Sequence, residues 1–196
     1  MLPSILPSAD LDPQIVWLAV LMWCLFFVVV GTLNRYQRAS VRRHRRYRRY
    51  AARVLQKLPE LESDGRRLCY LRKINPFVFE ELLLLAFERQ GYRVRRNARY
   101  SGDGGLDGQV WIAGTHYLIQ AKRYSRAIDP QHVADFARLL RQRNKAGLFI
   151  HTGRTGSKSR EIVRAYPQLT LISGQKLLIL LTGSSEWVAE KSIKNG

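Results

Sequence analysis

The sequence has little cysteine, little acidic charge and no repeated segment, and these scarcities exclude several classes of protein. Its two cysteines, Cys24 and Cys69, are too few for a disulfide-stapled secreted scaffold. The four histidines show no metal-ligand spacing, so a zinc site of the usual kind is not expected. Asp and Glu total 15 against 33 Lys and Arg, and the formal charge of +18 favours polyanionic partners such as nucleic acid or acidic lipid.

Charge is missing altogether from Pro13 to Asn34, and Ile15–Leu33 is apolar almost throughout. At about 1.5 Å per helical residue, such a run reaches roughly the 30 Å of a bilayer core. No Lys or Arg precedes Arg35, which argues against a cleaved signal peptide. We therefore expect a transmembrane helix over about 15–33, within an N-terminal segment 1–34.

A basic block follows, in which ten Lys or Arg and no acid lie between 35 and 57. Because Asp10 and Asp12 precede the apolar run, the asymmetry predicts an N-terminus outside the cytoplasmic (inner) membrane and a C-terminal domain inside. The block is interpreted as a juxtamembrane segment attracted to anionic lipid, with an auxiliary DNA-binding arm as the open alternative. Since Leu58–Gly65 combines Pro, Gly and three acids, residues 35–65 are expected to be stalk and linker.

Beyond the linker, residues 66–183 have the pattern of one globular domain, and the tail 184–196 carries no signal. Strands followed by strand–helix alternation predict an α/β sandwich with a mixed central sheet. Periodicity and turn signals predict helices over 77–90, 129–143, 157–166 and 175–181, and strands over 92–99, 109–113, 117–121, 147–151 and 169–172.

A glycine-rich turn and the strands after it carry the candidate chemistry. Glycines surround Asp103 and Asp107, so the backbone can bend tightly and bring a carboxylate to the start of a strand, although a solvent turn would look similar. Gln120 and Lys122 leave the same face of a later strand. Mg²⁺ takes oxygen ligands, which Asp107, the Gln120 amide and the Ala121 carbonyl could supply. Lys122 would then lie near the attacking water and the phosphate.

The segments FEELLLLAFERQGYRV, SGDGGLDG, IQAKRY and ISGQKLLILL, between 79 and 181, resemble the Mrr-type restriction endonuclease family of the PD-(D/E)xK nuclease superfamily. The resemblance implies a restriction-endonuclease-like fold and type IV-like cleavage of DNA with Mg²⁺, or with Mn²⁺ in its place. It also implies that Asp107, Gln120 and Lys122 are catalytic, with Gln replacing the commoner acid. Glu80 matches the Glu of the family's Phe-Glu pair.

Helical spacing independently favours Glu80 over Glu81, because the neighbours of Glu80 at i−3, i+3, i+4 and i+7 are all apolar. Glu80 is interpreted as support for the catalytic or metal site, or alternatively as part of a buried hydrogen-bond network. Asp103 is either a turn residue or an accessory to the site. Phosphate contacts are expected from Arg123, Arg126, Arg138, Arg141 and Lys145.

The sequence therefore predicts a membrane-anchored, Mg²⁺-dependent endodeoxyribonuclease. The alternative is a membrane-tethered DNA-binding module or sensor that kept the nuclease fold without catalysis. The intact Asp–Gln-x-Lys set favours the enzyme, since a pure binder has no need of a Lys beside two oxygen ligands. The target sequence or base modification, the strand preference and a homodimeric state stay open.

Overall fold

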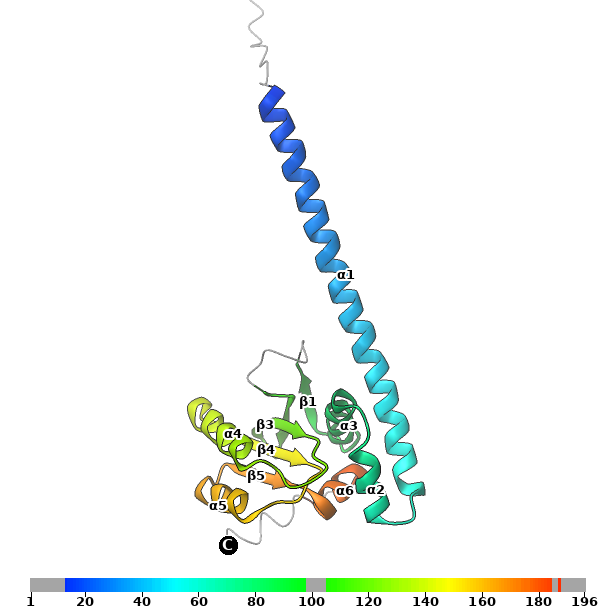
Figure 1. Ribbon diagram of the computed structural model, residues 1–196, viewed down its shortest axis with the longest axis vertical. Coiled ribbons are helices and arrows are strands. Elements are labelled where there is room, and N and C mark those ends of the chain that lie inside the picture. The colour runs from blue at the N-terminus through cyan, green and yellow to red at the C-terminus, as the bar shows by residue number, and fades with distance from the viewer. Residues whose placement is uncertain (1–12, 98–104, 185–186, 188–196) are drawn as a thin grey trace, which may run out of the picture. The chain divides into compact units, whose positions relative to one another are not determined.

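The computed structural model describes residues 13–97, 105–184 and 187, and within its first helix it does not describe the side chains of 13, 15–16, 33–34 and 36–40. Two compact units make up the chain, Met1–His44 and Arg45–Gly196. Helix α1, Pro13–Lys57, contributes to both units (Figure 1).

In the first unit, α1 exposes large apolar side chains, from Trp17 at 69% to Val29 at 45%. Among the described residues, no helix has both the length and the apolar character needed to cross a membrane. The transmembrane helix expected over 15–33 is therefore not found there. The side chains described in that run belong to 17–32, which extend about 24 Å as a helix, less than the roughly 30 Å of a bilayer core.

The second unit begins inside α1, within the basic block that the sequence had assigned to a juxtamembrane stalk. Tyr47 stacks on Phe77 with ring centroids 5.7 Å apart, and Ala51 and Val54 are completely buried. After the short 3-10 helix η1, Leu58–Glu60, helix α2, Asp64–Leu71, begins with the last two residues of the expected linker. An apolar stripe at helical spacing therefore lies between the arginines of the basic block and belongs to the core of the second unit.

A five-stranded mixed sheet forms the centre of the second unit, with strand order β1-β2-β3-β4-β5. The first three strands pair antiparallel, and β3, β4 and β5 pair parallel. This confirms the α/β class and the mixed sheet. The strands are β1 Arg93–Arg96, β2 Gly108–Ile112, β3 Thr115–Lys122, β4 Ala146–His151 and β5 Leu169–Ile172.

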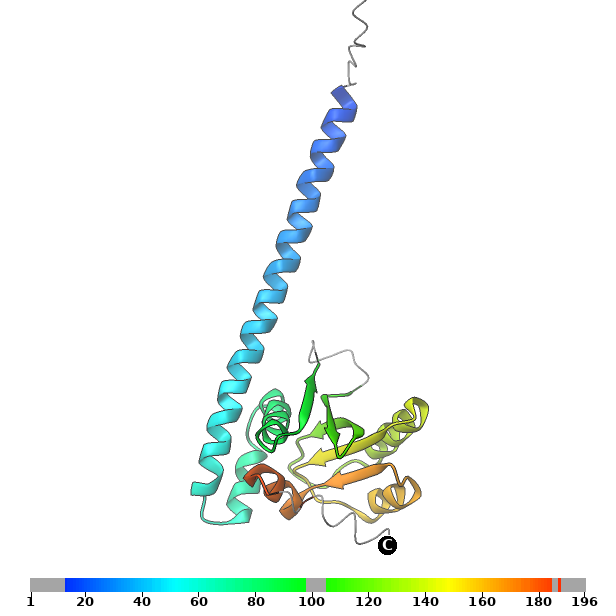
Figure 2. The same ribbon diagram turned by 180° about the vertical axis from the view of Figure 1, so that it is seen from behind.

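Helices cover both faces of this sheet (Figures 1 and 2). Helix α3, Pro76–Arg89, and helix α6, Gly174–Thr182, pack on one face together with the second half of α1. Helix α4, Pro130–Arg143, and helix α5, Ser157–Ala165, pack on the other. Strand β3 is therefore buried from both sides along 118–121, which makes its far end a rigid platform.

Local sequence explains where the two long helices of the sandwich begin. The Asn75 side chain accepts a hydrogen bond from the Phe77 amide at 2.9 Å, and Asp129 caps α4 in the same way through Gln131, also at 2.9 Å. A proline follows each capping residue at the first helical position, where its missing N–H costs nothing.

Candidate active site at the end of strand β3

Asp107 lies immediately before β2, beside the carboxyl-terminal half of β3. Its amide donates to the Ile119 carbonyl at 2.9 Å, and its Oδ2 accepts a hydrogen bond from the Ala121 amide at 2.6 Å. Burial raises the pKa of Asp107 to about 6, against the lowering effects of the Ala121 hydrogen bond and the Lys122 charge. These two hydrogen bonds hold the Asp107 carboxylate against the β3 backbone.

Gln120 is 8% exposed, and its amide is held in one orientation. Nε2 donates to the Gly105 carbonyl at 2.9 Å, while the buried Oε1 has no hydrogen-bond partner among the described residues. A buried amide oxygen without a partner is unusual and calls for a ligand. Gly105 makes the arrangement possible, since it has φ +81° and a Cβ there would lie 2.7 Å from Gln120 Nε2.

Lys122 is the last residue of β3 and is half-buried. Because side chains alternate along a strand, Lys122 leaves the same face as Gln120, as the sequence predicted. Its carbonyl accepts a hydrogen bond from the Thr152 amide at 3.3 Å, which ties the end of β3 to the segment after β4. The ammonium group is therefore carried on a strand end fixed from two sides.

Glu80 on α3 completes the electrostatic environment of the site. Burial is the main cause that raises its pKa to about 8, the nearby Asp107 and Glu81 charges add to the rise, and Lys122 opposes it. Glu80 is thus close enough to Asp107 and Lys122 to sense both charges. The structure brings together the four residues predicted as catalytic, Glu80, Asp107, Gln120 and Lys122, from α3, the β2 start and β3.

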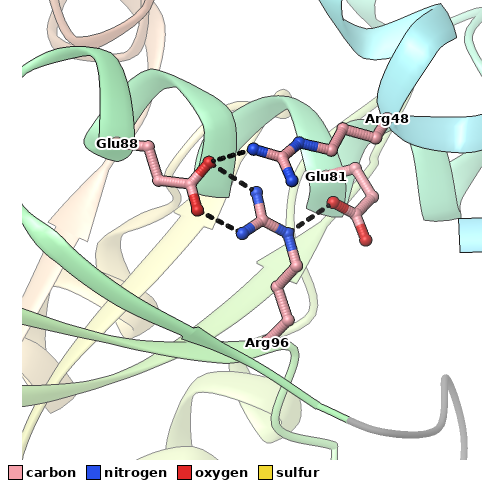
Figure 3. A network of polar contacts seen from close by, with 4 residues as sticks. All are labelled: Arg48, Glu81, Glu88 and Arg96. Atoms are coloured by element: carbon pink, nitrogen blue, oxygen red, sulfur yellow. Dashed lines mark hydrogen bonds and ion pairs between the residues drawn. The ribbon is translucent and has the colours of Figure 1, made fainter. Parts of the chain in front are cut away.

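The preference for Glu80 as the inward-facing acid was wrong in one respect. Glu81 is the more deeply buried, at 2% exposure, whereas Glu80 is only half-buried. Glu81 Oε2 accepts from Arg96 Nε on β1 at 2.9 Å (Figure 3). Helical spacing could not separate the two, because both side chains fall within the wide apolar arc of α3 and the Arg96 partner of Glu81 comes from β1.

Arg96 is the centre of a four-residue network shown in Figure 3. Its guanidinium also contacts both carboxylate oxygens of Glu88, with Nη2 2.9 Å from Oε2, and this hydrogen bonding lowers the pKa of Glu88. Arg48 of α1 reaches the same Glu88 oxygen at 3.0 Å. The network therefore joins β1, α3 and the second half of α1.

The described residues contain no cluster of three or more His, Cys, Asp or Glu side chains that could hold a metal ion. Any cation at this site would depend on a mixed set of oxygens. The buried Gln120 Oε1, which has no partner among the described residues, and the desolvated Asp107 carboxylate fit such an ion. The Ala121 N–H donates to Asp107, and the Ala121 carbonyl stays the third ligand that the sequence predicts.

The five basic residues predicted to contact DNA come from three parts of the second unit: the segment after β3, helix α4 and the residue just before β4. Arg123 and Arg126 follow β3 directly, although Nη1 of Arg123 donates to the Arg72 carbonyl. Lys145 lies beside Ala146, whose partner on β3 is Tyr117, about 16 Å along the strand from the site.

The other two basic residues, both on α4, already have partners. Arg138 pairs with Asp135 at 2.9 Å, and Arg141 lies 5.0 Å over the Tyr166 ring. Asp103, the suggested accessory acid, lies outside the described residues.

His151 was not singled out by the sequence, yet it is the β4 residue paired in register with Lys122. It is completely buried, and burial lowers its pKa to about 4, which keeps the ring neutral at physiological pH. Its Nε2 lies 3.3 Å from the Thr155 hydroxyl. The sequence offered one signal for His151: it is the last residue of a strand that was predicted to be buried. In the structure this strand runs parallel to β3, which carries Lys122.

Known proteins resemble the chain over the region that holds this site. A family model described as a restriction endonuclease, Mrr_cat, matches residues 71–181. The type IV methyl-directed restriction enzyme EcoKMrr of Escherichia coli (strain K12) is 28% identical over 132 residues, which cover 63% of this chain and 43% of that enzyme. The chain thus spans less than half the length of this relative. The MspJI restriction endonuclease, solved with a 27-mer oligonucleotide, is 23% identical with a TM-score of 0.46, over 68% of this chain and 33% of that one.

Proposed function

Since the chain belongs to the Mrr-type restriction endonuclease family, we propose that it is a metal-dependent endodeoxyribonuclease that hydrolyses phosphodiester bonds in DNA. The observation that carries the proposal is the fixed Gln120 amide beside Asp107 and Lys122, whose buried oxygen has no hydrogen-bond partner among the described residues. Burying a hydrogen-bond acceptor without a partner costs free energy, and a protein that only binds DNA gains nothing from that cost at this position.

The oxygens of Asp107 and Gln120, with the Ala121 carbonyl, would hold Mg²⁺ or Mn²⁺, both of which prefer oxygen ligands. When bound, such a cation supplies Lewis acidity toward the phosphate and acidifies water. Asp107 is suited to this role because its pKa of about 6 leaves it ionised at neutral pH, while its partial burial discourages hydration of the carboxylate.

Lys122 and Glu80 have separate tasks in this proposal. The Lys122 ammonium offsets the negative charge that develops on the attacked phosphate and orients the water. Glu80, with a pKa of about 8, keeps its proton at neutral pH in the metal-free chain, so it can donate a hydrogen bond where a second carboxylate charge would repel phosphate.

A plasmid-nicking assay of the full chain, with Mg²⁺ and with EDTA, tests the proposal. We expect Mg²⁺-dependent nicking, and a fall of about 10²-fold or more for Lys122→Ala, since this group acts mainly in the transition state. Lys158→Ala, which removes the same charge from the exposed surface of α5, should cleave like the parent chain. Equal cleavage by both variants would refute the role of Lys122, and no cleavage with retained DNA binding would favour the binding module.

We also propose that the N-terminal segment attaches the chain to the cytoplasmic membrane, with the nuclease on the cytoplasmic side. The charge-free sequence from Pro13 to Asn34, the exposed apolar side chains of 17–29 and the basic block after it support this. In fractionated cells, the chain should stay with the membranes after a high-salt wash and be released by detergent. Release by salt alone would contradict apolar attachment.

A further inference from the structure

A pocket lined by four arginines lies between the second half of α1 and α3. Arg45, Arg48, Arg49 and Ala52 follow i, i+3, i+4 and i+7 spacing, so they share one stripe of α1. Leu85 and Arg89, four residues apart on α3, form the facing side. The cavity volume is about 530 Å³, within the range of pockets that bind small ligands.

The charge around this pocket is strongly unbalanced. Glu88 pairs with the lining residue Arg48 at 3.0 Å, but it also pairs with Arg96, which in turn binds Glu81 (Figure 3). The four lining arginines and Arg96 make five guanidinium groups against two carboxylates, a net excess of three positive charges. Since like charges repel across a shared cavity, a bound anion would stabilise the arrangement.

We propose that this arginine pocket binds the phosphate group of a small ligand, with the apolar part of the ligand over Ala52 and Leu85. Guanidinium groups match phosphate oxygens with paired, charge-assisted hydrogen bonds, and several converging arginines select a dianion over a carboxylate. A nucleotide and an anionic phospholipid headgroup share this chemistry, because each joins a phosphate to a less polar body.

The pocket is separate from the site at the end of β3. Along α3, Arg89 lies about 13 Å from Glu80, so one phosphate cannot occupy both places. Ala52 and Leu85 place apolar surface between the arginines, which a compact ligand with an apolar part can contact and a DNA phosphate backbone cannot. The inference therefore goes beyond the proposed function, and its test does not use DNA cleavage.

Calorimetric titration of the full chain in nonionic detergent, with inorganic pyrophosphate and with ATP, tests the proposal. We expect saturable binding, reduced about tenfold or more by Arg49→Gln or Arg89→Gln, as for the loss of one charge-assisted contact. Arg46→Gln is the matched control, because Arg46 is exposed on the same turn of α1 but does not line the pocket. Ala52→Leu should weaken binding without any change of charge.

Three further arms identify the source of the phosphate. Binding of Arg49→Gln and Arg46→Gln is measured to phosphatidylcholine vesicles with and without phosphatidic acid. If Arg49→Gln weakens binding only to the vesicles that contain phosphatidic acid, the pocket binds a phospholipid headgroup. Equal losses for Arg46→Gln and Arg49→Gln with every ligand would overturn the proposal, since only general attraction to a basic helix would remain. If duplex DNA displaces pyrophosphate and Arg49→Gln weakens binding of the two equally, the pocket binds DNA and the proposal of a small ligand is wrong.

Discussion

Gly105→Ala is the substitution that tests the candidate site most sharply. Gly105 has φ +81°, and a Cβ there would lie 2.7 Å from Gln120 Nε2, where ordinary contacts begin at 3.4 Å. The Gln120 amide would have to withdraw by about 0.7 Å or more, since the backbone on the other side is held by the hydrogen bond from Asp107 to Ile119. The change therefore displaces the proposed ligand oxygen without altering any ligand.

The stability and the activity of this variant should respond differently. A left-handed alanine costs about 1–2 kcal/mol, and loss of the bond from Gln120 Nε2 to the Gly105 carbonyl adds about 1 kcal/mol. Because Nε2 ends a flexible side chain, the amide can swing away and no larger strain accumulates. A ligand or substrate misplaced by about 1 Å, in contrast, can lower the rate about 10²-fold.

Gly91→Ala supplies the matched control. Gly91 has φ +82°, nearly the same backbone strain, and a Cβ there meets nothing within 4 Å. Melting temperature and the initial rate of plasmid nicking with Mg²⁺ would be measured for both variants. Gly105→Ala should melt a few degrees below Gly91→Ala because it also loses about 1 kcal/mol with the Gln120 hydrogen bond, and the rate loss should be confined to Gly105→Ala. Equal rates in the two variants would refute a role for the Gln120 amide in catalysis.

Two further substitutions probe the acids of α3. Burial, with the charge of Asp107, raises the pKa of Glu80 to about 8, so its ionisation destabilises the fold increasingly as pH rises from about 4.5 through 8. In EDTA, Glu80→Gln should therefore melt higher than the parent chain near pH 9 and equally near pH 4, and a pH-independent difference would contradict this. Arg96→Met removes the ion-pair partner of the Glu81 carboxylate, which is 2% exposed, and should cost about 3 kcal/mol in urea denaturation. A loss below about 1 kcal/mol would mean that this ion pair contributes little to the stability of the fold.

Much of the sandwich could be predicted because its signals are local. The expected helices and strands from Phe77 to Leu181 occur in the predicted order, and β5 has the predicted bounds, 169–172. Asn75-Pro76 and Asp129-Pro130 determine where α3 and α4 begin through contacts two residues away, so the sequence contains the whole cause.

The part that was misjudged depends on contacts distant in sequence. Residues 45–57 carry so many arginines that composition indicated a juxtamembrane stalk attracted to anionic lipid, while Ala51 and Val54 between them are completely buried. Leu58–Gly65 has the composition of a linker, yet Ser63 accepts a hydrogen bond from the Arg66 amide and starts α2. The average composition of a segment does not reveal a narrow stripe of apolar residues on one face of a helix. That stripe is recognised as part of the core only once α3 packs against it.

The residues of the candidate site also fall into two groups, those that short-range features predicted and those that depend on contacts distant in sequence. Asp107, Gln120 and Lys122 were found because the turn and the strand alternation that position them are short-range features. The pairing of Glu81 with Arg96 spans 15 residues, and the position of His151 beside Lys122 depends on a parallel strand that only the folded sheet provides.

The region matched by the family model is smaller than the folding unit, because the second half of α1 is buried in the same core. The family match starts at residue 71, but Ala51, Val54, Leu55 and Leu58 already belong to the core that α3 closes. A fragment cut at Gly65 would leave this apolar face of α3 open to water and to other copies, at a cost of several kcal/mol. The folded Mrr-type domain therefore begins before the family match does, and a graft onto another protein has to carry the second half of α1 with it.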